Sequence, residues 1–478
     1  MDQFSLFSER RFWPFFYAQF LGAFNDNLFK FATTLLITYQ WQVAWLPPSL
    51  AGLIIGGVFI LPFVLFSAMS GQLADYFDKA RILQFVKVLE VVIMLIASMG
   101  FYVHSPLVLL VCIFLMGLHS TLFGPAKYSY LPERFNTGEL LGANALVEAG
   151  TFLAILLGNL LGGFLISTDY IAQSAHTQVS LACICLAVTG LISSWFIPSL
   201  TSSSNDSEAT YSSDAFAILR AVFTKWNPLK QTGHTLREAN NIAGMRAAMF
   251  GISWMWFYGA VFLSIFPSFS KDLLNGNAGV ASLLLFVFSM GLGAGALLCT
   301  SLKHPDYELG LVFVGLLGMT IFTFDLAYSV NAQAYASSLF EFHKPQLLSR
   351  PADAVLLNIM GFLSKAGSFR ILIDLCLVSA SVGLFSVPLY TFIQSYCPPE
   401  SCAKTIAANN ILNALFMISS AFIVGFLLFL GLSITQVFLF LSVSNFLALF
   451  YLAIQLPQLK THFVSSVREW IRDFKNPF

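Results

Sequence analysis

Long apolar stretches recur along the chain from about residue 12 to residue 456, separated by short polar segments. Each holds around 20 residues, enough to cross about 30 Å of hydrocarbon as an α-helix that rises 1.5 Å per residue. The pattern predicts about twelve membrane-spanning helices, at residues 12–38, 50–74, 82–103, 105–124, 140–167, 178–197, 247–269, 278–301, 309–330, 369–393, 404–430 and 433–456. We therefore expect an all-α integral membrane protein.

The composition agrees with this pattern. The 478 residues are 57% hydrophobic and only 10% charged, whereas about a quarter of the residues in soluble domains are charged. The first apolar stretch contains Asn25 and Asp26 and lacks a small-residue cleavage site, which indicates a retained helix rather than a signal peptide. The net charge is zero, and no basic tract with interleaved aromatic residues indicates nucleic-acid binding.

The basic residues are distributed unequally between the two sides of the predicted spans. Seventeen of the 24 lysines and arginines lie in the tails, the odd-numbered connections and the long middle loop, and four lie on the other side. Because basic residues accumulate on the cytoplasmic side, this asymmetry predicts that both termini are cytoplasmic.

The polar run at the start of the long middle loop divides the chain into two groups of six helices. We predict an N-terminal six-helix bundle (1–198), a cytoplasmic linker (199–245), a C-terminal six-helix bundle (246–456) and a cytoplasmic amphipathic tail (457–478). The linker contains aromatic residues at helical spacing, so it forms either a helix on the membrane surface or a solvated connection. The outer segment 331–368 has no role that its sequence identifies.

A weak internal repeat indicates that the two bundles are pseudo-symmetric. Residues 142–149 (GANALVEA) align with residues 407–414 (AANNILNA), and both segments open the fifth helix of their half. Two parallel six-helix repeats would place them at these positions.

The stretch FLGAFNDNLFK (20–30) of the first predicted helix carries four polar residues, Asn25, Asp26, Asn27 and Lys30. Ionised groups are costly in hydrocarbon, so these side chains must face protein or water and form a candidate substrate-binding site. Asp26 and Lys30 are four residues apart and can pair on one helix face. The alternative is an internal ion pair that only fixes helix packing.

Further candidate cavity residues occur at the fifth helix of each half. They are Asn144 and Glu148 in the first half, and Asn409 and Asn413, with Asn410 between them, in the second. Each set either lines a substrate cavity or joins neighbouring helices by hydrogen bonds.

Other intramembrane charges are expected to neutralise each other. Lys87 and Glu90 are three residues apart, and Arg370 and Asp374 are four apart, so each couple is predicted to pair within its helix. Asp325 is expected to lie alone near the outer end of its helix.

The loop after the second helix, GQLADYFDKARIL (71–83), contains Gly71, Asp75, Lys79 and Arg81. It resembles the signature loop of the major facilitator superfamily. Gly71 permits close helix approach, and Asp75 can accept hydrogen bonds from basic groups or from a helix N-terminus. We predict a gating latch that holds the outward-facing state.

Two further basic residues are gating candidates. Lys127 follows a Gly-Pro pair at the inner end of the fourth helix, where it is either a gate charge or an interfacial anchor. Arg246 begins the seventh helix and is predicted to be an inner-gate residue.

Three segments carry a narrower resemblance: FLGAFNDNLFK (20–30), FGPAKYSYLPE (123–133) and ELLGANALVEAGTFLAILLGNLLGG (139–163). A looser fourth is MFGISWMWFYGA (249–260). They look like the lysophospholipid transporter family of the major facilitator superfamily, including the transporter portion of fusions with a lipid acyltransferase. The resemblance implies a monomeric flippase that moves lysophosphatidylethanolamine and lysophosphatidylglycerol from the outer to the inner leaflet of a bacterial inner membrane.

The acyltransferase part of such fusions has a His followed five residues later by Asp, and none of the seven histidines here has that partner. We therefore predict no enzyme activity and no catalytic residues, and a separate acyltransferase partner would be needed to reacylate the lysolipid. The seven scattered cysteines indicate no metal site and no disulfide framework, and no cofactor is expected. The alternative function is proton-coupled efflux of a drug, siderophore or other amphiphile, with Asp26 or Glu148 as the titrating carboxylate.

Overall fold

A computed structural model describes residues 3–37, 48–167, 172–199, 245–302, 310–340 and 356–456, with isolated residues between 41 and 46 and between 227 and 244. The first helices are η1 (Gln3–Ser8), α1 (Trp13–Leu35), α2 (Pro48–Tyr76), α3 (Lys79–Tyr102), α4 (Pro106–Arg134), α5 (Thr137–Ser167) and α6 (Ala172–Trp195). The others are α9 (Met245–Ser268), η3 (Phe269–Leu273), α10 (Ala278–Ser301), α11 (Gly310–Phe340), α12 (Ile359–Leu363), α13 (Ser368–Tyr396), η4 (Pro399–Ser401), α14 (Cys402–Phe429) and α15 (Ile434–Gln455).

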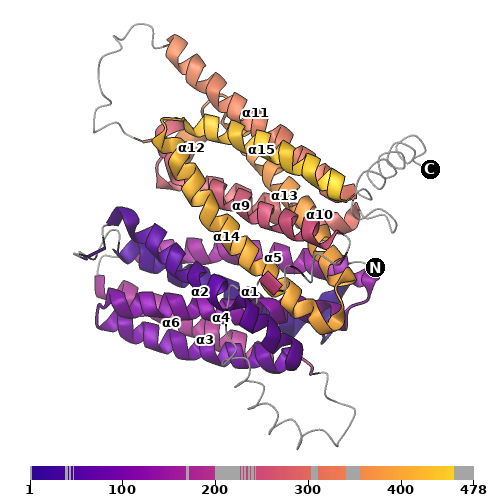
Figure 1. Cartoon of the computed structure of the whole chain (residues 1–478). Helices are drawn as coiled ribbons and strands as arrows, with labels where there is room; N and C mark the ends of the chain where they lie inside the picture. Colours follow the sequence, from indigo (N-terminus) through magenta and orange to yellow (C-terminus); the bar gives the residue numbers. More distant parts are fainter. Residues whose placement is uncertain are drawn as a thin grey trace, which may run out of the picture. The chain divides into compact units, whose positions relative to one another are not determined.

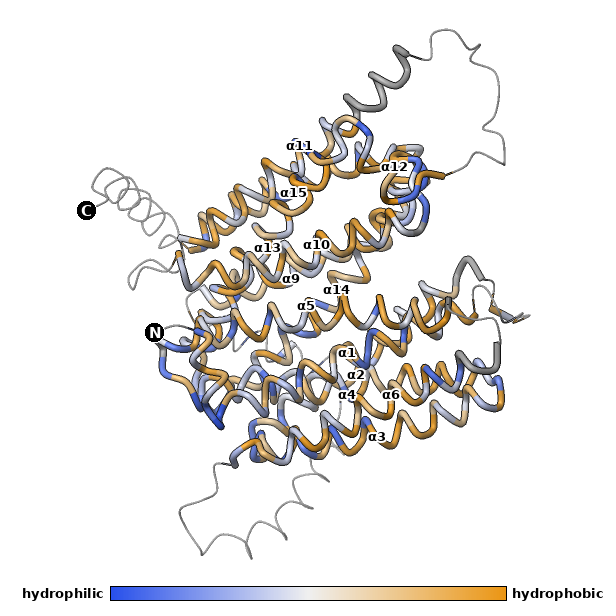
Figure 2. Tube along the Cα trace, turned by 180° about the vertical axis from the view of Figure 1, so that it is seen from behind, coloured by the Kyte–Doolittle hydropathy of each residue, from blue (hydrophilic) through white to orange (hydrophobic). Residues whose placement is uncertain are grey.

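The predicted spans coincide with the long helices of the described chain (Figure 1). Eleven helices among the described residues are long and apolar enough to cross a membrane. The first predicted span is α1, which is 23 residues long and contains the polar residues Asn25 to Lys30. Hydrophobic positions run along the length of the helices (Figure 2). The predicted all-α membrane fold is confirmed.

The chain divides into two compact units. Unit 1 comprises Met1–Ser253 and Tyr390–Leu415, and unit 2 comprises Trp254–Leu389 and Phe416–Phe478. The end of α13 and the first half of α14 therefore pack with the N-terminal helices. The boundaries of the two sequence halves, at 198 and 246, stay a prediction.

In unit 1, α1 packs against α5 and α6, α2 packs against α4, and α3 packs against α4 and α6. Glycines make the closest of these approaches possible. A Cβ on Gly158 of α5 would lie 2.6 Å from the carbonyl oxygen of Phe24 in α1. Small residues of this kind let membrane helices meet at backbone distance, where dispersion forces hold them together.

Unit 2 is built in the same way. Helix α11 lies beside α15 (Figure 1). A Cβ on Gly295 of α10 would lie 1.9 Å from the carbonyl oxygen of Ala380 in α13, so these two helices touch backbone to backbone.

Part of the outer segment 331–368 is described. Helix α11 continues to Phe340. Residues 341–355 are not described, and Leu357 forms backbone hydrogen bonds with the connection between η3 and α10. The N–H of Asn277 donates to the carbonyl of Leu357 at 2.9 Å, and the N–H of Leu357 donates to Asn275 at 2.8 Å. The predicted linker helix and the tail 457–478 fall outside the described residues.

The predicted pairing of Arg370 with Asp374 is wrong, and so is the expected isolation of Asp325. Arg370 Nη2 lies 2.6 Å from Asp325 Oδ1 on α11, while Asp374 accepts a hydrogen bond from Ser329 at 3.3 Å. The i, i+4 spacing permits a pair within one helix, but here a carboxylate on the adjacent helix takes the guanidinium through two of its nitrogens.

Candidate functional site

The polar residues of α1 point in different directions. Asp26 Oδ2 accepts a hydrogen bond from Ser120 of α4 at 2.6 Å, and its other oxygen has no hydrogen-bond partner among the described residues. Lys30 Nζ lies 3.8 Å from the centre of the Phe59 ring of α2, and no carboxylate in the described chain is within ion-pairing distance. The ion pair that the spacing of Asp26 and Lys30 permits is therefore not formed. Asn27 donates to Ala23 on its own helix at 2.8 Å.

Asn25 faces a buried charge network instead. Its amide nitrogen donates to Glu90 Oε1 at 2.8 Å, and the other oxygen of Glu90 lies 2.7 Å from Lys87 Nζ. His119 Nε2 of α4 is 3.3 Å from that same oxygen. The predicted neutralisation of Lys87 by Glu90 is confirmed, and Asn25 ties α1 to this pair.

Two glycines make room for the ammonium group of Lys87. A Cβ on Gly22 of α1 would lie 2.6 Å from Lys87 Nζ, and a Cβ on Gly190 of α6 would lie 3.1 Å from it. The lysine is fully buried, so the slot between α1 and α6 fits this side chain closely.

The loop predicted to be a latch makes the predicted kind of contact. Asp75 Oδ1 accepts the backbone N–H of Ala403 in the first turn of α14 at 3.0 Å, and Lys404 Nζ lies 3.5 Å from Asp75 Oδ2. A Cβ on Gly71 would lie 2.6 Å from Ala407 Cβ, so α2 and α14 touch closely. Asp75 thus meets both a helix N-terminus and a basic side chain.

The two basic residues of the predicted loop lie in the first turn of α3 and have different surroundings. Lys79 pairs with Glu133 at the end of α4, with 2.5 Å between Nζ and Oε1. Arg81 is exposed. Arg246, the second residue of α9, is also exposed.

Asn144 and Glu148 on α5 contact two different partners. Asn144 and Gln394 of α13 exchange hydrogen bonds through their side-chain amides. Tyr128 of α4 donates to Glu148 Oε1 at 2.5 Å. The Tyr128 ring stacks on Tyr390 with centroids 4.7 Å apart and planes at 3°. Within unit 1, these contacts join the end of α13 to α4 and α5.

Lys127 of α4 is buried and donates to Thr151 Oγ1 of α5 at 3.2 Å. The Thr151 hydroxyl in turn donates to Gln19 Oε1 of α1 at 3.1 Å. This cluster of Gln19, Lys127 and Thr151, which we name the inner polar cluster, links three helices.

The asparagines of α14 are buried in unit 1. Asn413 accepts a hydrogen bond from Ser253 of α9 at 2.8 Å. Asn409 Oδ1 has no hydrogen-bond partner in the described part of the chain. The amide nitrogen of Asn410 lies 2.8 Å from where a Cβ on Gly124 would be.

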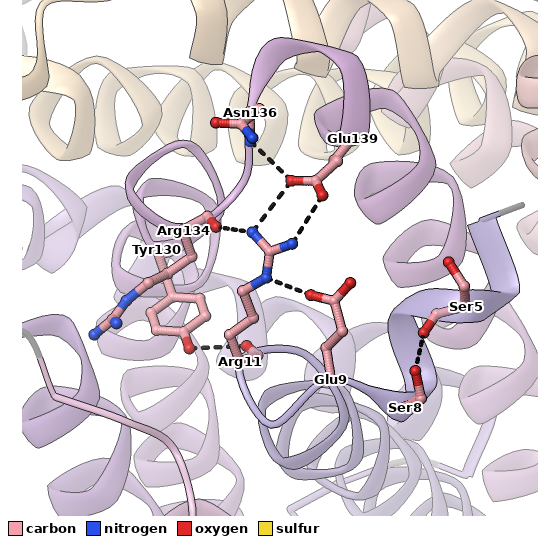
Figure 3. Close-up of polar contacts among 8 residues, drawn as sticks. All are labelled: Ser5, Ser8, Glu9, Arg11, Tyr130, Arg134, Asn136 and Glu139. Carbon is pink, nitrogen blue, oxygen red and sulfur yellow. Dashed lines mark hydrogen bonds and ion pairs between the residues drawn. The ribbon is translucent and has the colours of Figure 1, made fainter. Parts of the chain in front are cut away.

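The start of α1 is tied to the α4–α5 turn by Arg11 (Figure 3). Its guanidinium donates to both oxygens of Glu139, at 2.8 and 3.1 Å, to the side chain of Glu9, and to the carbonyl of Arg134. The hydrogen bonds from Arg11 to Glu9 and Glu139 raise the pKa of Arg11 above its ordinary value. Arg11 is therefore a permanently charged fastening at this end of unit 1.

Sequence reasoning missed several members of these clusters. They are Gln19, Ser120, His119, Tyr128, Thr151 and Gln394. Gln19, His119, Ser120 and Thr151 lie within predicted spans, whereas Gln394 directly follows the span 369–393 and Tyr128 lies four residues beyond the span 105–124. Their polarity within apolar spans is a signal that could have identified most of these residues, but it does not indicate which partners they bond. No group of three metal-ligating side chains occurs among the described residues.

Comparison with known proteins adds the family. The sequence model of the Major Facilitator Superfamily matches residues 15–343 of this chain. The lysophospholipid transporter LplT of Escherichia coli O7:K1 is 31% identical over 320 residues, covering 63% of this chain and 75% of that protein. The LplT of Shigella sonnei is 30% identical with the same coverage.

Solved structures share the fold at low sequence identity. The human organic anion transporter MFSD10 has a TM-score of 0.63 at 12% identity, covering 93% of this chain and 99% of that chain. The transporter FucP in an outward conformation has a TM-score of 0.62 at 12% identity, covering 92% and 97%. The family match and the LplT relatives show that the chain belongs to the major facilitator superfamily and, within it, to the family of the lysophospholipid transporter LplT.

Proposed function

We propose that this protein is a flippase that carries lysophospholipids, such as lysophosphatidylethanolamine and lysophosphatidylglycerol, from the outer to the inner leaflet of a bacterial inner membrane. The relatives named LplT support the substrate class. The proposed orientation has both termini in the cytoplasm, following the excess of basic residues at that side. A separate acyltransferase would then act on the delivered lysolipid.

The observation that carries this proposal is the separation of Asp26 from Lys30. The ammonium of Lys30 lies against the Phe59 ring and forms no ion pair with the described residues, and one oxygen of Asp26 has no hydrogen-bond partner among them. A phosphate can pair with the lysine, and an ammonium or glycerol hydroxyl can bond the carboxylate. The two groups therefore suit a lysolipid head, with Asn27 beside them on the same helix.

The other predicted substrate contacts have structural partners in this state. Asn25 holds Glu90, Asn144 holds Gln394, and Asn413 holds Ser253. Glu148 is likewise bonded by Tyr128. We propose that these residues act when the helices rearrange. Asn409, whose carbonyl oxygen is buried without a partner in the described chain, is already free to bond a head group.

We further propose that the contacts of α13 and α14 within unit 1 are the inner gate. Asp75 with Ala403, Tyr128 with Tyr390, and Asn144 with Gln394 all lie near the junction of α13 and α14. Alternating access requires such contacts to break when the cytoplasmic side opens. Gly71 allows the close approach, Lys79 and Arg81 flank it, and Arg246 lies at the start of α9.

A second candidate function is proton-coupled efflux of an amphiphile. It is favoured by the same absence of a direct Asp26–Lys30 ion pair, because a buried carboxylate that is not ion-paired can act as a proton carrier. Coupling to protons is measurable, so the two candidates can be separated.

The test is flipping of fluorescent lysophosphatidylglycerol and lysophosphatidylethanolamine in proteoliposomes, with and without a pH gradient. We expect head-group-selective flipping that needs no gradient. At lysolipid concentrations below KM, Asp26→Asn and Lys30→Gln should each slow it at least tenfold, while Lys365→Gln, which changes an exposed lysine of unit 2, should not. If a folded Asp26→Asn protein flips lysolipid at the native rate, the polar residues of α1 serve helix packing and not substrate binding. Strictly proton-dependent transport of another amphiphile, without lysolipid transport, would favour efflux.

A further inference from the structure

The inner polar cluster contains donors without acceptors. Lys127 Nζ makes one hydrogen bond, to Thr151, and an ammonium group has three N–H donors. No carboxylate of the described chain lies within ion-pairing distance of it. The amide nitrogen of Gln19 has no acceptor among the described residues either. Both side chains are more than nine-tenths buried, at 7% and 3% exposure.

The two donor groups converge. Lys127 Nζ and Gln19 Oε1 lie 3.2 and 3.1 Å from the same Thr151 hydroxyl, which also lies 2.7 Å from the carbonyl oxygen of Val147 one turn earlier, so the polar ends of the two side chains lie near each other. The nearby carboxylate of Glu148 is held by Tyr128 at 2.5 Å. Glu148 attracts the Lys127 ammonium without pairing with it directly. The ammonium therefore keeps N–H donors without acceptors among the described residues, and an adjacent amide that also lacks an acceptor calls for the same kind of ligand atom.

The geometry points to a second, inner binding station for the phosphate of the lysolipid head group, formed by Lys127, Gln19 and Thr151. This inference rests on the proposed function, in which Lys30 and Asp26 form the first station. Gln19 precedes Asp26 by seven residues, which is about 10 Å along α1 at 1.5 Å per residue. The head group would pass from one cation to the next as it crosses unit 1.

The station adjoins the contacts assigned to the inner gate. Tyr128 follows Lys127 directly, stacks on Tyr390, and offers its carbonyl to Gln394 at 3.1 Å. Separation of the Tyr128 and Tyr390 rings would release the backbone next to Lys127 from its contact with α13. The station thus becomes available as the gate opens, and Lys127 serves both head-group binding and gating, which is one of the two roles that its position in the sequence left open.

The test compares kinetic parameters for lysophosphatidylglycerol flipping in proteoliposomes. Lys127→Gln should lower the maximal rate at least about tenfold with KM changed less than about twofold, since the first station is intact and a lost bond to a charged group is worth about one decade or more. Lys127→Arg should restore most of the rate. Lys30→Gln should instead raise KM.

Controls separate the station from folding and from the proposed function. Thr151→Val removes one hydroxyl and should lower the maximal rate partly. Lys365→Gln should have the same rate as the native protein. Each variant is first shown to be monodisperse in detergent, which establishes that it is folded. An unchanged maximal rate in Lys127→Gln, or a rise in KM alone, would overturn the station while leaving flipping intact. Failure of the native protein to flip lysolipid would overturn the proposed function and the station with it.

A soluble probe identifies the source of the phosphate. Glycerol 3-phosphate added inside the liposomes should inhibit the native protein and not Lys127→Gln if the station takes a phosphate without its acyl chain. Inhibition that is equal in both proteins would contradict phosphate binding at Lys127.

Discussion

Asn25 of α1 donates a hydrogen bond to Glu90 of α3 at 2.8 Å, in the interior of unit 1. The bond sets the rotation of α1, because the next residue, Asp26, is then directed toward Ser120 of α4. A residue that looks like a substrate ligand in the sequence therefore positions its neighbour. The buried pair of Lys87 and Glu90 supplies the anchor for that arrangement.

Glu90→Gln should destabilise the protein strongly. The change leaves Lys87 buried without its counter-charge, and breaking a buried pair from one side costs about 3–5 kcal/mol. The double variant Lys87→Met/Glu90→Gln should recover a large part of the loss, since replacing both partners with neutral groups is tolerated better. Thermal unfolding in detergent measures both effects. A single variant as stable as the native protein would contradict the inferred role of the pair.

Asp75→Ala should loosen the junction of α13 and α14. It removes the acceptor of the Ala403 N–H and the partner of Lys404, and hydrogen bonds to charged groups are worth about 1.5–3 kcal/mol. Cys402, buried at the first turn of α14, should then be alkylated about tenfold faster. Peptide mass spectrometry after maleimide treatment measures this rate. Asp272→Asn, an exposed acid on η3, is the matched control and should leave the rate unchanged.

Gly71→Ala should give the same result without removing any polar group. The new Cβ would lie 2.6 Å from Ala407 Cβ and 2.9 Å from the carbonyl oxygen of Ala403, and backbone atoms cannot yield cheaply. Gly259→Ala is the control, because a Cβ there meets nothing within 4 Å. It should be neutral or stabilise α9 by up to about 1 kcal/mol. Equal Cys402 alkylation in both variants would show that Gly71 is not a close contact.

Gly295→Ala should destabilise unit 2. Its Cβ would lie 1.9 Å from the carbonyl oxygen of Ala380, so α10 and α13 would have to separate. Overpacking of this kind typically costs about 1–3 kcal/mol, occasionally more. The unfolding temperature in detergent should fall relative to both the native protein and Gly259→Ala. An unchanged temperature would mean that the two helices separate without cost.

The sequence predicted the helices well because hydrocarbon imposes one rule on every span, and a run of apolar residues satisfies it locally. The kind of contact that Asp75 makes was also predictable, since a carboxylate at the end of a helix can accept hydrogen bonds from basic groups and helix N-termini. Its partners on α14, 328 positions away at Ala403, were not. The partners of the buried polar residues were not. Asn25 meets Glu90 across 65 positions, and Asn144 meets Gln394 across 250.

The wrongly predicted pair of Arg370 and Asp374 also shows that helix spacing does not identify the partner of a polar residue. Arg370 and Asp374 have good spacing within α13, but helix rotation brings Asp325 of α11 to the guanidinium. Lys30 likewise has Asp26 one turn away and lies on Phe59 instead. Spacing within one helix states which contacts are possible, whereas the rotation of each helix in its bundle decides which are made.

The slot for Lys87 also constrains how this protein can change over time. A side chain at position 22 would occupy the space of the Lys87 ammonium, and one at position 190 would crowd it. Admitting a side chain at position 22 would require the Lys87 ammonium to move, so a change at this glycine is coupled to the pairing of Lys87 with Glu90. A substitution at Gly22 would therefore disturb a charge pair at a distant position in the sequence, and a chain without the lysine would tolerate it better.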